Sequence, residues 1–112
     1  FEFFIDEKWT LEALFNVLNN KLRYAKSHIT IRVYRNKLYH VIEISDDGES
    51  IANHERTKIF ERFYKGERSD SNSVGIGLAI TREIMELQNG KVTIKDENTF
   101  KFLFDDKTVT SL

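Results

Sequence analysis

The sequence predicts an α+β two-layer sandwich, in which a mixed, mostly antiparallel sheet of about five strands is covered on one face by three helices. Two stretches with apolar residues at three- and four-residue steps predict long helices over about residues 8–26 and 76–88. Alternating stretches joined by short turns predict two hairpins, over residues 29–45 and 91–104. Helices that interrupt antiparallel pairs favour this class over the regular alternation of a Rossmann or P-loop fold, and no G-x-x-x-x-G-K-[ST] motif occurs.

The first elements are a strand remnant and a helix. Residues 1–5 read Phe-Glu-Phe-Phe-Ile, which resembles the end of a strand, so we expect an excised domain. Asp6 is placed to cap the helix that follows, because its carboxylate can accept from the free N–H groups of the first turn. The apolar positions expected to face the core of this helix are Leu11, Leu14, Phe15, Leu18 and Leu22.

The remaining elements follow from turn residues and polar stretches, since the chain contains no proline. We expect strands at 29–34 and 39–45, a short helix at 54–63, a loop without apolar residues at 66–73, the second long helix, and strands at 91–95 and 100–104. Asn89 and Gly90 supply a stop for that second long helix. Residues 1–105 are expected to form one domain, followed by a tail at 106–112.

Composition excludes several classes of protein. At 112 residues the chain has room for one small core, to which nine Phe contribute much of the volume. A formal net charge of −1, with both signs mixed along the chain, argues against a nucleic-acid binder. The absence of cysteine excludes disulfides and cysteine-rich zinc sites and fits a reducing compartment. No apolar run approaches the ~18 residues of a membrane span, so we expect no direct membrane contact.

Two asparagines on the first helix are candidates for a cation site. Asn16 and Asn20 are four residues apart and share one helix face, and Arg23 follows one turn later. Amide oxygens can complete the shell of a cation that keeps several waters, as magnesium does, while a guanidinium would take phosphate charge. The alternative is an ordinary exposed polar face.

The loop after the second expected strand is a candidate base-binding element. Asp46 follows directly after that strand, and a carboxylate there can accept a hydrogen bond from an exocyclic amine such as that of adenine. Gly48 permits a tight turn and the close approach of a planar base. The alternative is a common Asp-Gly turn.

The segment that enters the second long helix is a candidate phosphate site. Gly75 and Gly77 precede that helix, and the N–H groups and dipole of a helix N-terminus attract anions. Upstream, Phe60 and Phe63 are expected to anchor the polar loop to the core and leave Lys65 free to reach a phosphate. The alternatives are a linker with a helix start, and aromatic residues that belong to the core.

In this order the four motifs resemble the N, G1, F and G2 boxes of the catalytic ATP-binding domain of bacterial sensor histidine kinases. That Bergerat-fold (GHKL) family includes the gyrase, Hsp90 and MutL ATPases. The resemblance runs from about Asp6 to Phe104, and residues 59–65 followed by 75–80 match the kinase branch in particular. Residues 6–9 are similar to the helix entry of kinases with short membrane sensors that respond to cell-wall antibiotics.

The resemblance implies a magnesium–ATP site. Its nucleotide-binding residues would be Asn16, Asn20, Arg23, Tyr24, Asp46, Gly48, Ile51, Lys65, Gly75, Gly77 and Leu78. Mg²⁺ would be held at Asn20 and Asn16, Asp46 would accept from the adenine amino group, and the two later glycines would flank a lid over ATP.

The resemblance also implies a protein-histidine kinase of a two-component system. Its catalytic domain would donate the γ-phosphoryl group of ATP to a histidine on a dimerisation domain absent from this chain, for relay to a response regulator. The acceptor histidine and its neighbouring base lie on that domain, so no catalytic residue is expected here and the chain alone should not phosphorylate itself. The parent is expected to be membrane-bound, with this domain in the cytoplasm.

Three positions depart from the family pattern. Ser50 and Ser73 stand where glycines are usual, and Lys21 replaces the small residue that normally follows the second asparagine. The Lys21 side chain would either crowd the site or point outward without effect. These departures keep open a degenerate, nucleotide-free interaction module, and an anti-sigma-type serine kinase on the same fold is a further alternative.

None of the three histidines is expected to be a phospho-acceptor or a metal ligand. His54-Glu55-Arg56-Thr57 is similar to an acceptor motif but is one residue short and lies inside the ATP-binding domain. His28 and His40 have no partners at metal-binding spacing.

Overall fold

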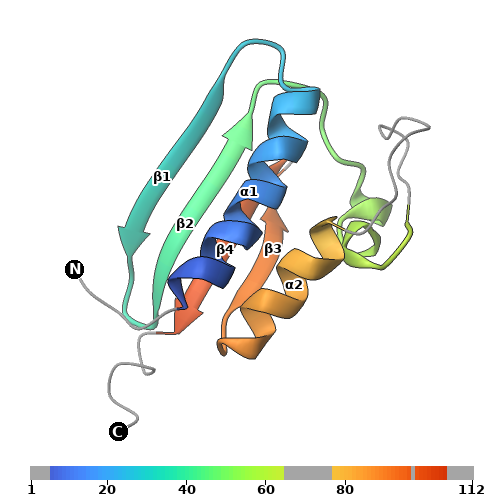
Figure 1. The fold of residues 1–112 in the computed structure, drawn as a ribbon. Coiled ribbons are helices and arrows are strands. Elements are labelled where there is room, and N and C mark those ends of the chain that lie inside the picture. Colours follow the sequence, from blue (N-terminus) through green and yellow to red (C-terminus); the bar gives the residue numbers. More distant parts are fainter. Residues whose placement is uncertain (1–5, 65–76, 97, 106–112) are drawn as a thin grey trace, which may run out of the picture.

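A computed structural model describes residues 6–64, 77–96 and 98–105. In this part of the chain two α-helices lie side by side on one face of an antiparallel four-stranded sheet with the strand order β1-β2-β4-β3 (Figure 1). The elements are α1 (Glu7–Tyr24), β1 (Ile29–Arg35), β2 (Tyr39–Asp46), α2 (Gly77–Leu87), β3 (Lys91–Lys95) and β4 (Thr99–Asp105). The predicted α+β two-layer class is confirmed, and the expected first strand, residues 1–5, lies outside the described residues.

Helix α1 begins where the sequence predicts. The Asp6 carboxylate accepts a hydrogen bond of 3.0 Å from the Trp9 backbone N–H, as an N-cap does. The side-chain oxygen of Gln88 accepts from the Asp6 N–H at 2.6 Å, so the start of α1 is tied to the region just after α2.

The buried face of α1 differs from the predicted apolar stripe. Its buried residues are Thr10, Ala13, Val17 and Lys21. Leu14 and Leu18 pack partly against the core, whereas Leu11, Phe15 and Leu22 are exposed. The prediction was wrong for these three because α1 packs against α2 on one side and against the sheet beneath, while its side toward β1 is not covered by a helix (Figure 1).

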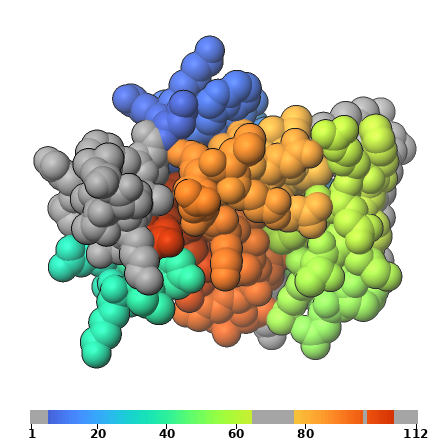
Figure 2. All heavy atoms as spheres, turned by 90° about the horizontal axis from the view of Figure 1, so that it is seen from below, coloured from blue at the N-terminus to red at the C-terminus, as the bar shows by residue number. Residues whose placement is uncertain are grey.

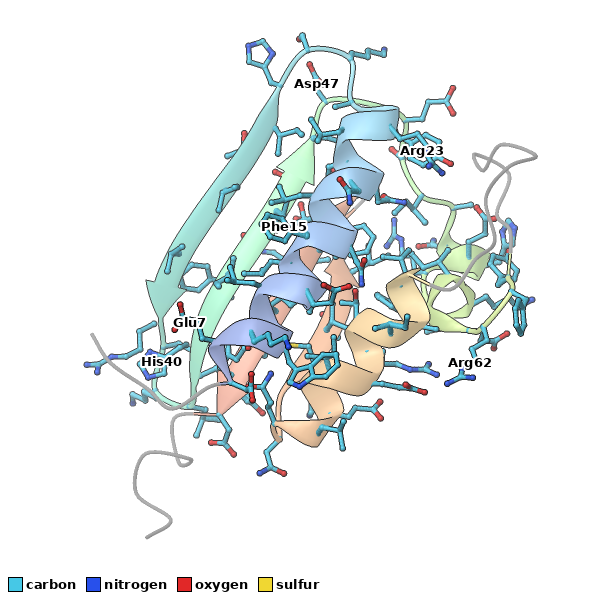
Figure 3. All side chains as sticks on the ribbon, in the orientation of Figure 1. Glu7, Phe15, Arg23, His40, Asp47 and Arg62 are labelled. Atoms are coloured by element: carbon cyan, nitrogen blue, oxygen red, sulfur yellow. The ribbon has the colours of Figure 1, made fainter. Side chains whose placement is uncertain are left out.

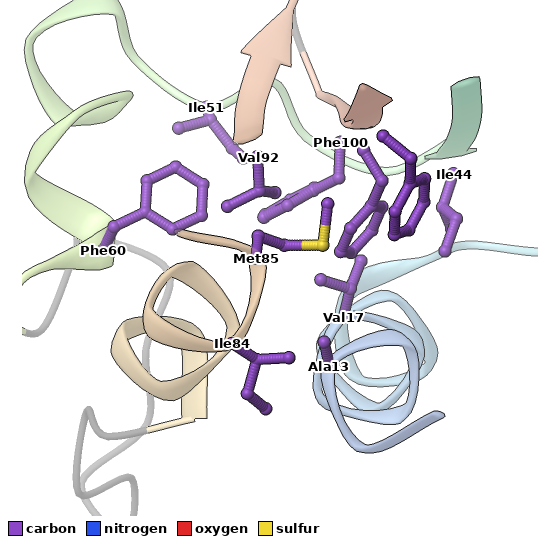
Figure 4. Close-up of a cluster of buried hydrophobic side chains, with 11 residues drawn as sticks. Ala13, Val17, Ile44, Ile51, Phe60, Ile84, Met85, Val92 and Phe100 are labelled. Atoms are coloured by element: carbon purple, nitrogen blue, oxygen red, sulfur yellow. The ribbon is translucent and has the colours of Figure 1, made fainter. Parts of the chain in front are cut away.

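The core lies between the two layers (Figure 4). Met85 of α2 and Phe100 of β4 are fully buried at its centre, and Val17 reaches it from α1. Each large apolar side chain buried in this way contributes about 1.5–3 kcal/mol. The other members are Ala13, Ile44, Ile51, Phe60, Ile84, Val92, Phe102 and Phe104.

The expected short helix at 54–63 consists of two single-turn 3₁₀ segments, Asn53–Glu55 and Lys58–Phe60, and the second lies against α2 (Figure 2). Phe60 is buried and meets Phe100 edge to face, with ring centroids 6.0 Å apart. Phe63 has a φ of 65° and is 68% exposed, so the prediction that it anchors the following loop was wrong. The reversal of the backbone at this residue turns its ring away from the core.

Helix α2 ends through Asn89 and Gly90, as predicted. Asn89 adopts the left-handed conformation, with a φ of 60°, and donates its N–H to the Glu86 carbonyl. The Gly90 N–H donates to the Met85 carbonyl at 2.8 Å, which completes a Schellman motif. A Cβ on Gly90 would come within 2.7 Å of the Leu103 carbonyl oxygen, so the glycine is required for close packing on β4.

Neither helix in the described ranges has the combination of length and apolar character that a membrane span requires.

Candidate functional site

Three close approaches bring the predicted motifs together around the C-terminal half of α1. Gly77, at the start of α2, lies beside Asn16: a Cβ built on it would be 3.7 Å from the side-chain amide carbon. Gly48 lies against the carbonyl of Tyr24, at the end of the helix. Asp46, at the end of β2, is paired with Lys21. One helix therefore joins the first motif to the two glycine-containing loops.

Asn16 and Asn20 each present a buried polar atom to this region. The Asn16 amide nitrogen and the Asn20 amide oxygen have no hydrogen-bond partner among the described residues. A buried polar group without a partner costs free energy and is rare in folded proteins, so such a group calls for an explanation. An oxygen ligand suits a hard cation, and an N–H donor suits a phosphate oxygen, so the two amides fit a magnesium–phosphate group.

The start of α2 adds a favourable field for an anion. Thr81 holds this end of α2 to α1, because its single hydroxyl proton is shared between the Gly77 carbonyl, at 3.0 Å, and the Ala13 carbonyl of α1, at 3.3 Å. The N-terminus of an 11-residue helix carries partial positive charge, and here it is placed next to Asn16. Phosphate oxygens would meet donors and positive potential together.

The carboxylate of Asp46 is already occupied by donors of the protein. Its Oδ1 accepts from the Lys21 ammonium at 2.6 Å, and its Oδ2 accepts from the Gly48 N–H at 2.8 Å. Neither the Asp46 nor the Lys21 side chain has exposed surface. The group predicted to read an adenine amine is therefore closed to solvent in this conformation.

The environment of Lys21 decides between the two orientations that the sequence left open. The ammonium points inward, donates to the Asn98 carbonyl as well as to Asp46, and lies 4.8 Å from the centre of the Phe100 ring. The Asn98 side chain in turn donates to the Asp46 carbonyl at 2.9 Å. Asn98 was missed by sequence reasoning because its part depends on the β3–β4 turn meeting the end of β2, which no local pattern shows.

Gly48 is needed for the approach of α1 to the β2 loop. A Cβ at this position would overlap the Tyr24 carbonyl oxygen and lie 2.6 Å from Asp46 Oδ2. The close approach that the glycine permits is therefore to the backbone of the protein itself.

The other predicted site residues divide into three groups. Arg23 is exposed at the C-terminal end of α1 (Figure 3), beside the partly buried Tyr24. Ile51 belongs to the core cluster and Leu78 packs partly against it, so both support the loops that carry them. Lys65 and Gly75 lie outside the described residues.

Asp47 fixes the loop between α1 and β1. Its carboxylate accepts from the backbone N–H groups of Lys26 and Ser27 and from the Ser27 hydroxyl. Hydrogen bonds from the Ser27 hydroxyl and backbone, with a further contribution from His28, hold the pKa of the Asp47 carboxyl far below its usual range. These contacts place Asp47 at the same end of the molecule as Arg23 (Figure 3).

Histidines and carboxylates do not assemble into a metal site in the part of the chain that is described. No group of three or more His, Cys, Asp or Glu side chains there is arranged to hold an ion. A cation at this site would depend on the amides of Asn16 and Asn20, on phosphate oxygens and on water.

Residues 5–108 match the family of histidine kinase-, DNA gyrase B- and HSP90-like ATPases, and the chain belongs to this family. This match confirms the ATPase family that the four motifs predicted.

Among curated relatives, the heme sensor protein HssS of Staphylococcus aureus is 36% identical over 95 residues, which are 83% of this chain and 21% of that protein. The HssS of Staphylococcus saprophyticus is 33% identical over 94 residues, covering 82% of this chain and 20% of that protein. The chain thus spans about a fifth of the length of the curated relatives it matches.

Solved structures with the same fold include two histidine kinases. The mycobacterial sensor histidine kinase MprB aligns with a TM-score of 0.81 and 21% identity, covering 89% of this chain and 74% of that chain. The catalytic domain of histidine kinase ThkA aligns with a TM-score of 0.76 and 20% identity, covering 91% and 70%. At these identities the likeness establishes the fold.

Proposed function

We propose that this domain binds magnesium–ATP at the C-terminal half of α1 and presents its γ-phosphoryl group to a histidine on a separate dimerisation domain. The observation that carries the proposal is the pair of buried, unpartnered amide atoms on Asn16 and Asn20, next to the N-terminus of α2. Phosphoryl transfer needs mainly positioning and charge neutralisation, and this arrangement is suited to both.

Asn20 and Asn16 would hold Mg²⁺, which when bound would neutralise charge on the phosphates. The Asn16 N–H and the first turn of α2, including Gly77, would donate to phosphate oxygens. Arg23 would add positive charge from the exposed end of α1, and Tyr24 and Leu78 would border the nucleotide. The parts proposed for Lys65, Gly75 and Ile51 rest on the resemblance.

The whole protein would be a protein-histidine kinase in a two-component system. Its remaining partners would be the phospho-acceptor domain of the same protein and a response regulator. We place this domain on the cytoplasmic side of a membrane-bound parent, since ATP and a response regulator would both be reached there. Support comes from a heme sensor protein among its relatives and from a sensor histidine kinase among the structures with the same fold.

Replacing Asn20 with alanine tests the site. Asn20→Ala should weaken MgATP binding about 10- to 100-fold, as expected when a contact to a charged group is lost. The matched control is Asn19→Ala, which removes the same side chain from an exposed position of the same helix and should bind like the wild type. Calorimetric titration with and without magnesium would measure both, and unchanged binding by Asn20→Ala would contradict the proposed role.

A nucleotide-free interaction module is the second candidate. The observation that favours it is the closed Lys21–Asp46 pair, which occupies the carboxylate expected to receive the base. The same titration decides between the kinase domain and the interaction module, because the module would bind ATP neither with nor without magnesium.

A further inference from the structure

The Lys21–Asp46 pair lies inside the proposed nucleotide site and not on the surface. Lys21 belongs to α1 and Asp46 to the end of β2. Their charged atoms are 2.6 Å apart, and neither side chain has exposed surface. The pair is held on all sides described: by the Gly48 N–H, by the Asn98 carbonyl and by the ring of Phe100.

This packing determines what Asp46 can still do. An ionised carboxylate is an acceptor only, and it selects an amino-bearing base when a lone pair is open toward that base. Here one oxygen accepts from an ammonium and the other from a backbone N–H, and the side chain has no exposed surface through which a base could reach the remaining lone pairs. A base could reach Asp46 only after the ammonium moved, and separating a buried ion pair leaves an unpaired charge in the interior.

The phosphate side of the site is built differently. It consists of the unpartnered amide atoms of Asn16 and Asn20 and the backbone at the start of α2. The described hydrogen bonds of the Lys21 ammonium go to none of these groups. Contacts to phosphate do not distinguish one base from another.

We propose that Lys21 is a specificity-determining residue: by holding Asp46 in a closed ion pair, it withdraws the base-selecting carboxylate, so that this domain binds nucleoside triphosphates through their phosphates and discriminates little between adenine and guanine. The inference rests on the proposed function, because it concerns the base half of the same site.

The wild-type chain provides the first test and needs no variant. Calorimetric titrations with MgATP and with MgGTP should give dissociation constants within about threefold of each other, since no charge-assisted contact to the base is available. A preference for MgATP of about tenfold or more, the size expected for one such contact, would overturn the proposal.

The second test reopens the carboxylate. Lys21→Ala restores a small side chain, so MgATP binding should strengthen and the preference for MgATP over MgGTP should rise to about tenfold or more. Adding Asp46→Ala should abolish that gain and return the ratio toward one, and this double variant also avoids leaving a lone buried charge. Lys8→Ala, an exposed lysine of the same helix, controls for the change in net charge.

Unfolding curves recorded in parallel separate selectivity from stability. A folded Lys21→Ala protein that is less stable but has the wild-type ATP-to-GTP ratio would show that the pair is only structural and would overturn the proposal. If Lys21→Ala does not fold, the ratio of the wild-type protein decides.

Failure of the proposed function gives a different pattern. If the wild type binds neither nucleotide, the proposed function fails for the native chain, and the inference, which requires binding through the phosphates, fails with it. If the wild type binds MgATP with a strong adenine preference, the function stands and the inference fails.

Discussion

At the scale of single residues, Gly48 is constrained by space and Gly77 is not. A Cβ at Gly48 would overlap the Tyr24 carbonyl oxygen, whereas one at Gly77 would make only an ordinary contact of 3.7 Å with Asn16. Gly48→Ala should therefore destabilise the domain by about 1–3 kcal/mol, as overpacking does. Gly77→Ala should leave stability unchanged or raise it by up to ~1 kcal/mol, because alanine favours the helix. Urea unfolding measures both, and equal effects would contradict this assignment.

Asp47 should make stability depend on pH. The hydrogen bonds from Ser27 and His28 lower the pKa of its carboxyl in the folded state below the value in the unfolded chain. Its contribution is then complete above a pH of about 4, the unfolded value, and is lost as the pH falls further toward the folded value. Asp47→Asn should accordingly lower the melting temperature at pH 7, and the difference in melting temperature from the wild type should become smaller below pH 4. The control Glu12→Gln, at an exposed site on α1, should melt at the wild-type temperature at every pH. A melting-temperature difference for Asp47→Asn that does not change with pH would contradict the proposed role of its carboxylate.

At the scale of elements, the N-cap of α1 offers the clearest prediction. Asp6→Ala removes the acceptor for the Trp9 N–H and should cost about 1 kcal/mol. For a domain of this size that lowers the melting temperature by roughly 4–8 °C. The control Glu12→Ala changes an exposed mid-helix carboxylate, and a similar loss in both variants would mean that capping is not the cause.

Local patterns predicted the elements well because caps, turns and alternation act over a few residues. Both helices and all four described strands lie within about two residues of their expected bounds. The patterns failed where neighbours decide: Leu11, Phe15 and Leu22 form an apolar stripe in sequence, yet the faces of α1 turned to α2 and the sheet are those of Ala13 and Val17. In place of the helix expected at 54–63, the structure has two separate 3₁₀ segments of three residues each.

At the scale of the whole molecule, the chain should not label itself. None of the three histidines is predicted to be the phospho-acceptor, which is expected on another domain. Incubation of the isolated chain with γ-labelled ATP should leave it unlabelled, while addition of the dimerisation domain of the parent protein should give label on that domain. Label on this chain that disappears in His54→Ala would contradict the prediction that His54 is not a phospho-acceptor.

The sequence by itself determined the class of this protein, because the order and spacing of four short motifs and two amphipathic helices are local properties of the chain. It also predicted which residues would gather: the structure brings together Asn16, Asp46, Gly48 and Gly77 around α1. Only the tertiary structure decided what Lys21 does. Its inward orientation depends on Asp46, Asn98 and Phe100, which reach it from distant parts of the chain, and a buried charge takes whatever partners the packed fold supplies.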